Sequence, residues 1–182
     1  ANGYLLEQFL NPNVNTREDQ YGGNLINRSR LTVEIAQAVA SAIGAEKIGI
    51  RFSPFSELND QKAYDTNEVN DTYAYLSAEL DKIGIAYIHI SASPAIPEQT
   101  YKGIREAFRN TIIYCNGLTP ESAEELLNGN SADLVAFGRG FLANPDFVSR
   151  IEKNVPLNDV DFNTLYSPGE QGYIDYPFYT SK

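Results

Sequence analysis

Apolar residues recur every three or four positions in two long stretches of the chain, which is the spacing of one face of a helix. The first stretch lies between Gly23 and Gly44, and the second covers residues 69–83 and ends at Gly84. Glycine directly after the last apolar position is a common helix end. The pattern therefore predicts two long helices. The apolar face of the first carries Leu31, Ile35, Val39 and Ile43.

Short runs that are rich in β-branched and aromatic residues predict four strands, at 47–52, 86–90, 111–115 and 134–137. Shorter helices are predicted at 104–108, after Thr119-Pro120-Glu121 and at 144–151. Strands that alternate with helices are typical of a parallel sheet. The fold class is therefore α/β, with strand-helix units over residues 1–154. An aromatic tail over 155–182 is expected to pack back on them.

Two architectures accommodate four parallel strands. A closed (β/α)₈ barrel needs eight strands and typically about 250 residues, so a chain of 182 residues would supply only part of one. A doubly wound open sheet needs no more strands, but no G-x-G-x-x-G follows any of them, which gives a dinucleotide-binding domain little support. The hydrophobic pattern alone does not choose further.

The composition narrows the function classes. Lys and Arg number 14 against 24 Asp and Glu, and this net charge of −10 argues against nucleic acid or an anionic membrane as a partner. Apolar residues make up 42% of the chain, which is typical of a packed core, but no run approaches the length of a membrane span. No secretory leader opens the chain, and the single Cys115 cannot form an internal disulfide. These features favour a cytoplasmic protein.

In both architectures, residues at the C-terminal ends of the strands meet at the ligand. Arg51 stands in an otherwise apolar strand, where either an anionic ligand or a partner carboxylate would explain a cation. His89 has a similar place on the next strand, and a lone histidine is more often a hydrogen-bonded core residue than a catalytic one. Tyr4 is a candidate proton donor, although core packing is the default for any one of 12 tyrosines.

The last two predicted strands end in glycine-containing loops. Asn116 and Gly117 follow the third strand, and Gly138 and Arg139 follow the fourth. In a barrel these adjacent loops offer backbone amides and one guanidinium to a phosphate group. The alternative is two ordinary glycine turns and a surface arginine.

Several motifs of the chain closely resemble those of the old yellow enzyme family. They are A-N-G-Y-L-L and Q-F-L-N-P near the start, N-T-R-E-D-Q-Y-G-G, I-G-I-R-F-S-P, A-F-G-R, A-N-P-D, and G-Y-I-D-Y-P near the end. The resemblance implies FMN-dependent ene-reductase chemistry on a (β/α)₈ TIM barrel. It also implies that this chain is the C-terminal half, strands 5–8 with their helices.

The resemblance assigns roles to particular residues. Tyr4 matches the tyrosine that protonates the substrate α-carbon, and Asn2 matches one of two side chains that bind the carbonyl or nitro oxygen. The histidine that pairs with Asn2 would lie outside this chain. Arg51 matches the arginine facing N1 and O2 of the flavin. The remaining matches are Asn116, Gly117, Gly138 and Arg139 for the FMN phosphate, and Tyr173 for the rim of the substrate pocket.

By the same resemblance, the protein is an oxidoreductase that uses NAD(P)H to reduce the activated C=C bond of α,β-unsaturated carbonyl or nitro compounds. The activity would require the complementary N-terminal half-barrel, because the paired histidine and the first three barrel strands with their flavin contacts lie outside this chain. A half-barrel also exposes two sheet edges and an apolar inner face, which a partner should cover. That partner would be the N-terminal half, as a second chain or as the rest of the polypeptide, and the alternative partner is a second copy in a homodimer. The alternative is a non-catalytic half-barrel that binds FMN or phosphate. A different phosphate-binding barrel enzyme is a third, weaker interpretation.

Overall fold

Four parallel strands form one sheet in the order β1-β2-β3-β4, in a computed structural model that describes residues 1–91, 96–115 and 117–180. The strands are β1 (Gly49–Phe52), β2 (Tyr87–Ser91), β3 (Thr111–Cys115) and β4 (Leu134–Ala136). This arrangement confirms the predicted α/β class. β1 begins two residues later than expected because Ala45–Lys47 form a short 3₁₀ turn after α2.

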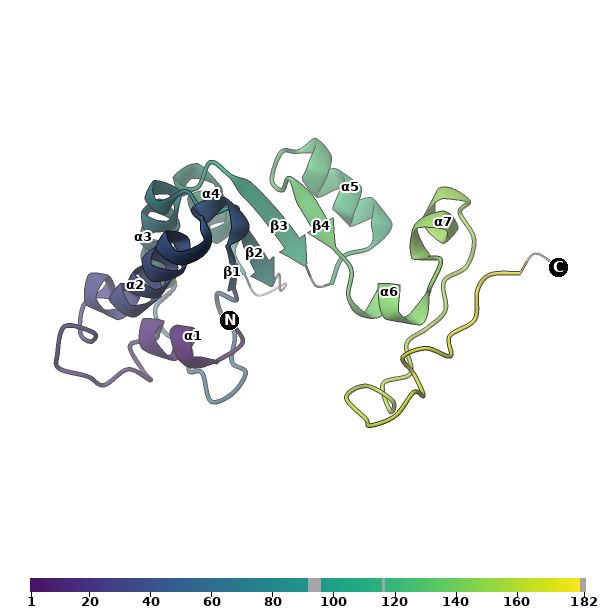
Figure 1. The fold of residues 1–182 in the computed structure, drawn as a ribbon, viewed down its shortest axis with the longest axis horizontal. Coiled ribbons are helices and arrows are strands. Elements are labelled where there is room, and N and C mark those ends of the chain that lie inside the picture. Colours follow the sequence, from purple (N-terminus) through teal and green to yellow (C-terminus); the bar gives the residue numbers. More distant parts are fainter. Residues whose placement is uncertain (92–95, 116, 181–182) are drawn as a thin grey trace.

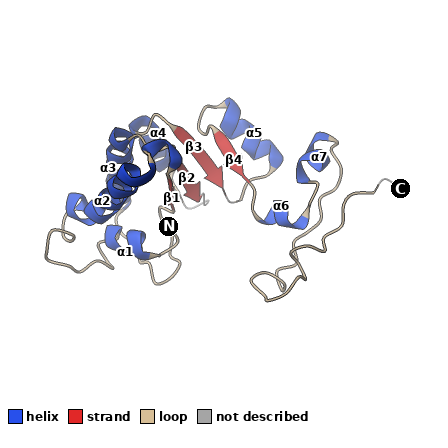
Figure 2. Cartoon of the chain, viewed as in Figure 1, coloured by secondary structure: helices blue, strands red, loops and turns tan. Residues whose placement is uncertain are grey.

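The two longest helices, α2 (Leu25–Ile43) and α3 (Thr66–Ile83), are those that the hydrophobic spacing predicts, and each ends at the expected glycine. The capping box of Thr119 with Ser122 starts α5 (Pro120–Asn128). The other helices are α1 (Leu5–Leu10), α4 (Glu98–Ala107), α6 (Arg139–Ala143) and α7 (Phe147–Glu152). Figures 1 and 2 show α2, α3 and α4 gathered on one side of the sheet.

The two faces of the sheet differ in burial. In register, Ile88 lies beside Ile112 and Arg51 beside His89, and successive residues of a strand point to opposite faces. The face beneath the helices is formed by Phe52, Ile88, Ile90, Ile112 and Tyr114, all at most 2% exposed. We call this the covered face. The other, which we call the open face, carries Arg51 and His89.

The core lies between the covered face and the helices. Leu76 and Leu80 of α3 and Ile104 of α4 are fully buried there. Burial of a side chain of this size contributes roughly 1.5–3 kcal/mol. The stability of the described residues therefore resides mainly on one side of the sheet.

The apolar stripe of α2 is exposed rather than buried. Ile35, Val39 and Ile43 are exposed, whereas Arg28, Ser29 and Thr32 are the buried residues of this helix. The reason is that α2 stands at the edge of the arrangement, where it contacts α1, the 3₁₀ turn and α3. The core side of α2 combines the buried polar residues with Val33 and Ala36, which pack against the core, and the apolar stripe has no cover among the described residues.

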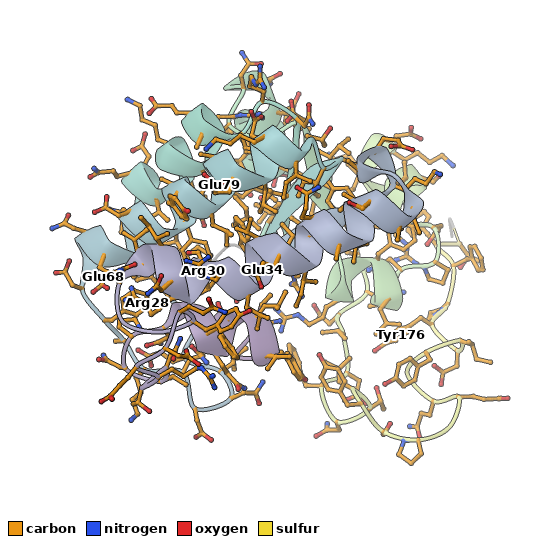
Figure 3. The ribbon with its side chains drawn as sticks, turned by 60° about the vertical axis from the view of Figure 1, so that its left-hand side comes forward. Arg28, Arg30, Glu34, Glu68, Glu79 and Tyr176 are labelled. Carbon is orange, nitrogen blue, oxygen red and sulfur yellow. The ribbon has the colours of Figure 1, made fainter. Side chains whose placement is uncertain are left out.

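Arg28 ties α2 to its surroundings. Its guanidinium donates to the carbonyls of Leu10, at 2.8 Å, and Gly23, and it forms an ion pair with Glu68 of α3. Figure 3 shows Arg28 and Glu68 side by side where the two helices meet. A buried guanidinium is tolerated when its donors are satisfied in this way.

The tail packs on α6 and α7 rather than on the sheet. Arg150 donates to the carbonyl of Pro177 at 2.7 Å, and the N–H of Tyr179 donates to Asp146 at 2.9 Å. Figure 1 shows the tail continuing away from the strands. Phe162 remains 65% exposed in this arrangement. None of the described helices is both long and apolar enough to cross a bilayer.

Candidate functional site

A groove of about 630 Å³ lies at the C-terminal ends of the strands. It lies where the N-terminal segment, the ends of β1–β4 and the tail meet. Among its lining residues are five of the eight predicted site residues: Asn2, Arg51, Gly117, Gly138 and Arg139. Tyr4 and Tyr173 do not line it, and Asn116 lies outside the described residues.

Asn2 is held by its backbone. Its N–H donates to the hydroxyl of Ser53 at 2.6 Å, and its carbonyl accepts from the side-chain amide of Asn59 at 2.7 Å. Asn2 and Gly3 both have left-handed backbone conformations, with φ of 56° and 76°. These bonds leave the side-chain amide of Asn2 available at the groove.

Gly3 is required by space as well as by conformation. A Cβ at this position would lie 2.1 Å from the carbonyl oxygen of Leu58. Such a distance is far inside van der Waals contact, so only glycine allows the loop to pass this close to Leu58. The path of the segment that carries Asn2 and Tyr4 therefore depends on glycine at position 3.

Tyr4 directly precedes α1 and is 69% exposed. Its backbone is fixed, because its N–H donates to the carbonyl of Ala1 at 3.2 Å and its carbonyl accepts from Gln8 at 3.0 Å. Its hydroxyl forms no hydrogen bond with any residue in the described ranges. The phenol is thus free to donate to a ligand.

Arg51 lies on the open face without a carboxylate partner among the residues that the structure describes. Of the two explanations for a cation in this strand, the geometry favours an anionic ligand. Arg51 also acts on His89, its neighbour in register. Burial lowers the pKa of His89 below 6.5, and the charge of Arg51 lowers it further.

His89 is not the hydrogen-bonded core residue that the sequence suggests. Its Nε2 is buried and has no hydrogen-bond partner within the described part of the chain. Because the pKa is lowered, the imidazole is neutral near pH 7. Arg51 is therefore the cation of this strand pair, and an unpaired imidazole nitrogen lies on the same face.

The second cation at the groove is Arg139, the first residue of α6. Its guanidinium carbon lies 5.7 Å from the ring centre of Phe162 in the tail. Gly138, just before it, has open space in the direction of a Cβ, and Gly117 combines such space with a φ of 70°. The two glycines leave backbone accessible beside Arg139, as a bound phosphate requires.

Tyr173 is linked to the groove through Tyr166. Its hydroxyl accepts the N–H of Tyr166 at 2.8 Å. Tyr166 itself lines the groove, is 95% exposed and has a φ of 62°. No local feature of the sequence distinguishes Tyr166 from the other aromatic residues of the tail.

Neither Glu7 nor Ser53 is marked as a site residue by the sequence alone. Glu7 is 5% exposed and accepts from the hydroxyl of Ser53 at 2.6 Å. The two residues are 46 positions apart, so no local motif signals their contact. The only available signal is an acidic residue within an otherwise apolar run, L-L-E-Q-F-L.

Comparisons with known proteins place the chain in a family. The family model of the NADH:flavin oxidoreductase / NADH oxidase family matches residues 1–158. The chain is 40% identical to a 12-oxophytodienoate reductase-like protein of Solanum lycopersicum, covering 98% of this chain and 49% of that protein. It is 39% identical to Enoate reductase 1 of Kluyveromyces lactis, with 98% and 49% covered.

A solved structure of morphinone reductase in complex with tetrahydroNAD superposes with a TM-score of 0.92 at 41% identity. The match covers 99% of this chain and 49% of that one. The chain thus spans about half the length of the curated relatives it matches. Its four-stranded parallel sheet corresponds to half of a TIM barrel.

Proposed function

Because the chain belongs to the NADH:flavin oxidoreductase / NADH oxidase family, we propose that it forms the C-terminal half of an FMN-dependent ene-reductase of the old yellow enzyme type. The enzyme uses NAD(P)H to reduce the activated C=C bond of α,β-unsaturated carbonyl or nitro compounds. The observation that carries the proposal is the groove, which joins Asn2, Arg51, Gly138 and Arg139 at one edge of the sheet.

The residues present fit FMN. A groove of about 630 Å³ is within the range of cofactor sites, roughly 300–1,000 Å³. Arg139 and the backbone at Gly138 and Gly117 would hold the phosphate, with Asn116 as a further candidate in the same loop. Arg51, which has no carboxylate partner among the described residues, would face the pyrimidine edge of the flavin. Bound FMN supplies hydride transfer from the nicotinamide to the β-carbon of the alkene.

The chain's own residues act on the substrate. Asn2 would donate its side-chain amide to the carbonyl or nitro oxygen, where negative charge grows during the reaction. Tyr4, with its free hydroxyl, would donate a proton to the α-carbon. Arg51 would stabilise the negative charge of the reduced cofactor. Tyr173 would lie at the rim of the substrate pocket and act through the backbone of Tyr166.

We propose that the complementary N-terminal half-barrel completes the site, on the same polypeptide or as a second chain. Three exposed features support this partner: the α2 stripe of Ile35, Val39 and Ile43, the exposed Leu134 of β4, and the unpaired outer edge of β1. Each is a surface that the second half of a barrel would cover. Cytoplasmic location belongs to the same proposal and rests on the acidic, single-cysteine composition.

The test uses the completed assembly, meaning this chain together with its N-terminal half. Loaded with FMN and reduced anaerobically by NADPH or NADH, it should be reoxidised by cyclohexenone with a saturable rate. The Tyr4→Phe variant should keep its flavin while turnover falls roughly 10²–10⁴-fold, the usual range for a general acid. Tyr21→Phe is the matched control, because the hydroxyl of Tyr21 binds Glu34 on the outer surface.

Three results would contradict parts of this proposal. Bound FMN with no reoxidation by activated alkenes would favour the non-catalytic FMN-binding module. An assembly that binds phosphate but no flavin would favour a different phosphate-binding barrel enzyme. Unchanged turnover in Tyr4→Phe would remove the role given to Tyr4.

A further inference from the structure

A buried carboxylate lies directly beneath the loop that carries Asn2 and Tyr4. Glu7 of α1 accepts three hydrogen bonds: from the N–H of Gly3 at 2.5 Å, from the hydroxyl of Ser53 at 2.6 Å and from the hydroxyl of Tyr73 at 3.0 Å. These donors come from the loop, from the end of β1 and from α3. One side chain therefore joins the loop to the sheet and to a core helix.

Ser53 extends this network to Asn2. Its hydroxyl donates to Glu7 and accepts the N–H of Asn2 at 2.6 Å. The backbone N–H groups of two consecutive loop residues are thus linked to the same carboxylate. That of Gly3 donates to it directly, and that of Asn2 is linked to it through the hydroxyl of Ser53. Their carbonyls are held separately, by the side chains of Asn59 and Gln8, each at 2.7 Å.

Glu7 forms no ion pair with a described residue, so the three hydrogen-bond donors are its direct partners. A buried carboxylate is costly unless hydrogen-bond donors compensate for lost water. Tyr73 remains such a donor, because burial, and next the charge of Glu7, raise its pKa well above 10. An apolar side chain would serve packing at less cost, so the carboxylate has a further purpose.

That purpose follows from the backbone it holds. Asn2 and Gly3 adopt left-handed conformations in succession. Such conformations persist where the surrounding structure fixes them, and they are typical of functional sites. Without Glu7, the N–H of Gly3 would lose its acceptor. The hydroxyl of Ser53, which accepts the N–H of Asn2, would lose the carboxylate to which it donates. The loop would then be free to relax.

We propose that Glu7 is a positioning residue that, through Gly3 and Ser53, holds the side chains of Asn2 and Tyr4 in the direction needed by the substrate. The inference rests on the proposed function, which gives Asn2 and Tyr4 their roles. A misplacement of about 1 Å can reduce a rate roughly 10²-fold. A loss of this network therefore lowers turnover, whereas Arg51, Gly138 and Arg139, the groove residues assigned to the cofactor, lie outside the network.

The test compares three variants of the completed assembly. Glu7→Gln keeps the shape but places an N–H group among three donors, and we expect kcat with cyclohexenone to fall about 10–100-fold. Flavin affinity should stay within about twofold of the wild type, because Arg51, Gly138 and Arg139, which are assigned to the cofactor, form no hydrogen bond with Glu7. Ser53→Ala, which removes the link to Asn2, should lower kcat about 3–10-fold.

Tyr73→Phe is the matched control. It removes a hydrogen bond to the same carboxylate from a residue that forms no hydrogen bond with Asn2, Gly3 or Tyr4. A structural role of the network predicts that Tyr73→Phe and Ser53→Ala behave alike. A positioning role predicts that Tyr73→Phe changes the melting temperature but leaves kcat within about twofold.

Amide hydrogen exchange gives a readout independent of turnover. Protection of Gly3 should fall in Glu7→Gln, while Tyr73→Phe keeps it. Wild-type kcat together with wild-type Gly3 protection in Glu7→Gln would overturn the inference. If Glu7→Gln does not fold, equal kcat in Ser53→Ala and wild type would overturn it. A wild-type assembly that shows no turnover would instead contradict the proposed function, and the loss of Gly3 protection would still establish that Glu7 holds the loop.

Discussion

The two faces of the sheet, formed by alternate residues of the same strands, have opposite characters. On the covered face Ile88 and Ile112 are fully buried, whereas on the open face Arg51 is exposed and the Nε2 of His89 has no partner among the described residues. The alternation of side chains along a strand permits this division. Packing is concentrated on one face and the proposed ligand chemistry on the other, so the two can be varied separately.

The same contrast explains why polar side chains on the open face lack partners among the described residues. Polar side chains that lack partners are costly in a finished core, but they are appropriate where a cofactor or a second half of the barrel is to bind. The exposed Leu134 of β4 and the α2 stripe lie at the edges of the half-barrel. Substitutions on the two faces should therefore have different effects.

The largest expected effect is on the covered face. Ile88→Ala should lower the free energy of unfolding by about 2–5 kcal/mol, because it leaves a cavity in the core. Leu134→Ala, on the open face and already 54% exposed, should cost less than about 1 kcal/mol. Urea unfolding of the isolated chain measures both. Equal losses would mean that the open face is packed in solution.

A second pair of variants tests the loop at the edge of the open face. Gly3→Ala combines a left-handed φ with the contact to Leu58, whereas Gly23→Ala has the left-handed φ and open space. The conformation alone costs roughly 1–2 kcal/mol. Gly3→Ala should exceed that value in urea unfolding and also lower turnover. If the two variants lose the same stability, the close approach to Leu58 is absent.

The third prediction concerns Arg51. Arg51→Leu should weaken FMN binding to the completed assembly about 10-fold or more, as the loss of a charge-assisted contact implies. Its effect on stability should be negligible, since it forms no ion pair with a described residue. Arg109→Leu, which removes a cation that pairs with Asp81 on the helix side, is the control. Fluorescence titration of FMN decides, and equal affinities in all three proteins would contradict the assignment.

The smallest effect is a pH dependence. Burial, and then the charge of Arg51, hold the pKa of His89 below its usual 6.5. The folded state therefore binds the proton more weakly than the unfolded state. Stability is highest above pH 6.5 and declines as the pH falls through the lowered folded pKa.

His89 is the single histidine of the chain, so its NMR titration is unambiguous. The midpoint should lie below 6.5 in the isolated chain and should rise in Arg51→Leu, where the neighbouring charge is gone. A midpoint at or above 6.5 in the wild type would show that the imidazole is solvated.

The sequence predicts the strands well, because each is a short run of β-branched and aromatic residues between breakers. For α2 it predicts the helix and its apolar face, but not that Ile35, Val39 and Ile43 of that face are exposed. The 3.6-residue spacing shows that a helix has an apolar face but does not show which neighbour covers it. The short helices α1 and α6 have too few turns for a periodic signal.

For the site, the motifs locate Asn2, Arg51, Gly138 and Arg139 at one groove. They do not reveal Glu7, whose partners Ser53 and Tyr73 are 46 and 66 positions away. Such contacts depend on the packing of α1 against the strand end and α3, which no local pattern encodes.

Native mass spectrometry of this chain mixed with its N-terminal half and FMN tests the central claim most directly, since the open face and its groove are taken to be half of a flavin site. We predict one complex that contains both halves and one FMN, and loss of the FMN in Arg51→Leu. A chain that stays at 20.2 kDa without flavin when its N-terminal half is present would contradict the account.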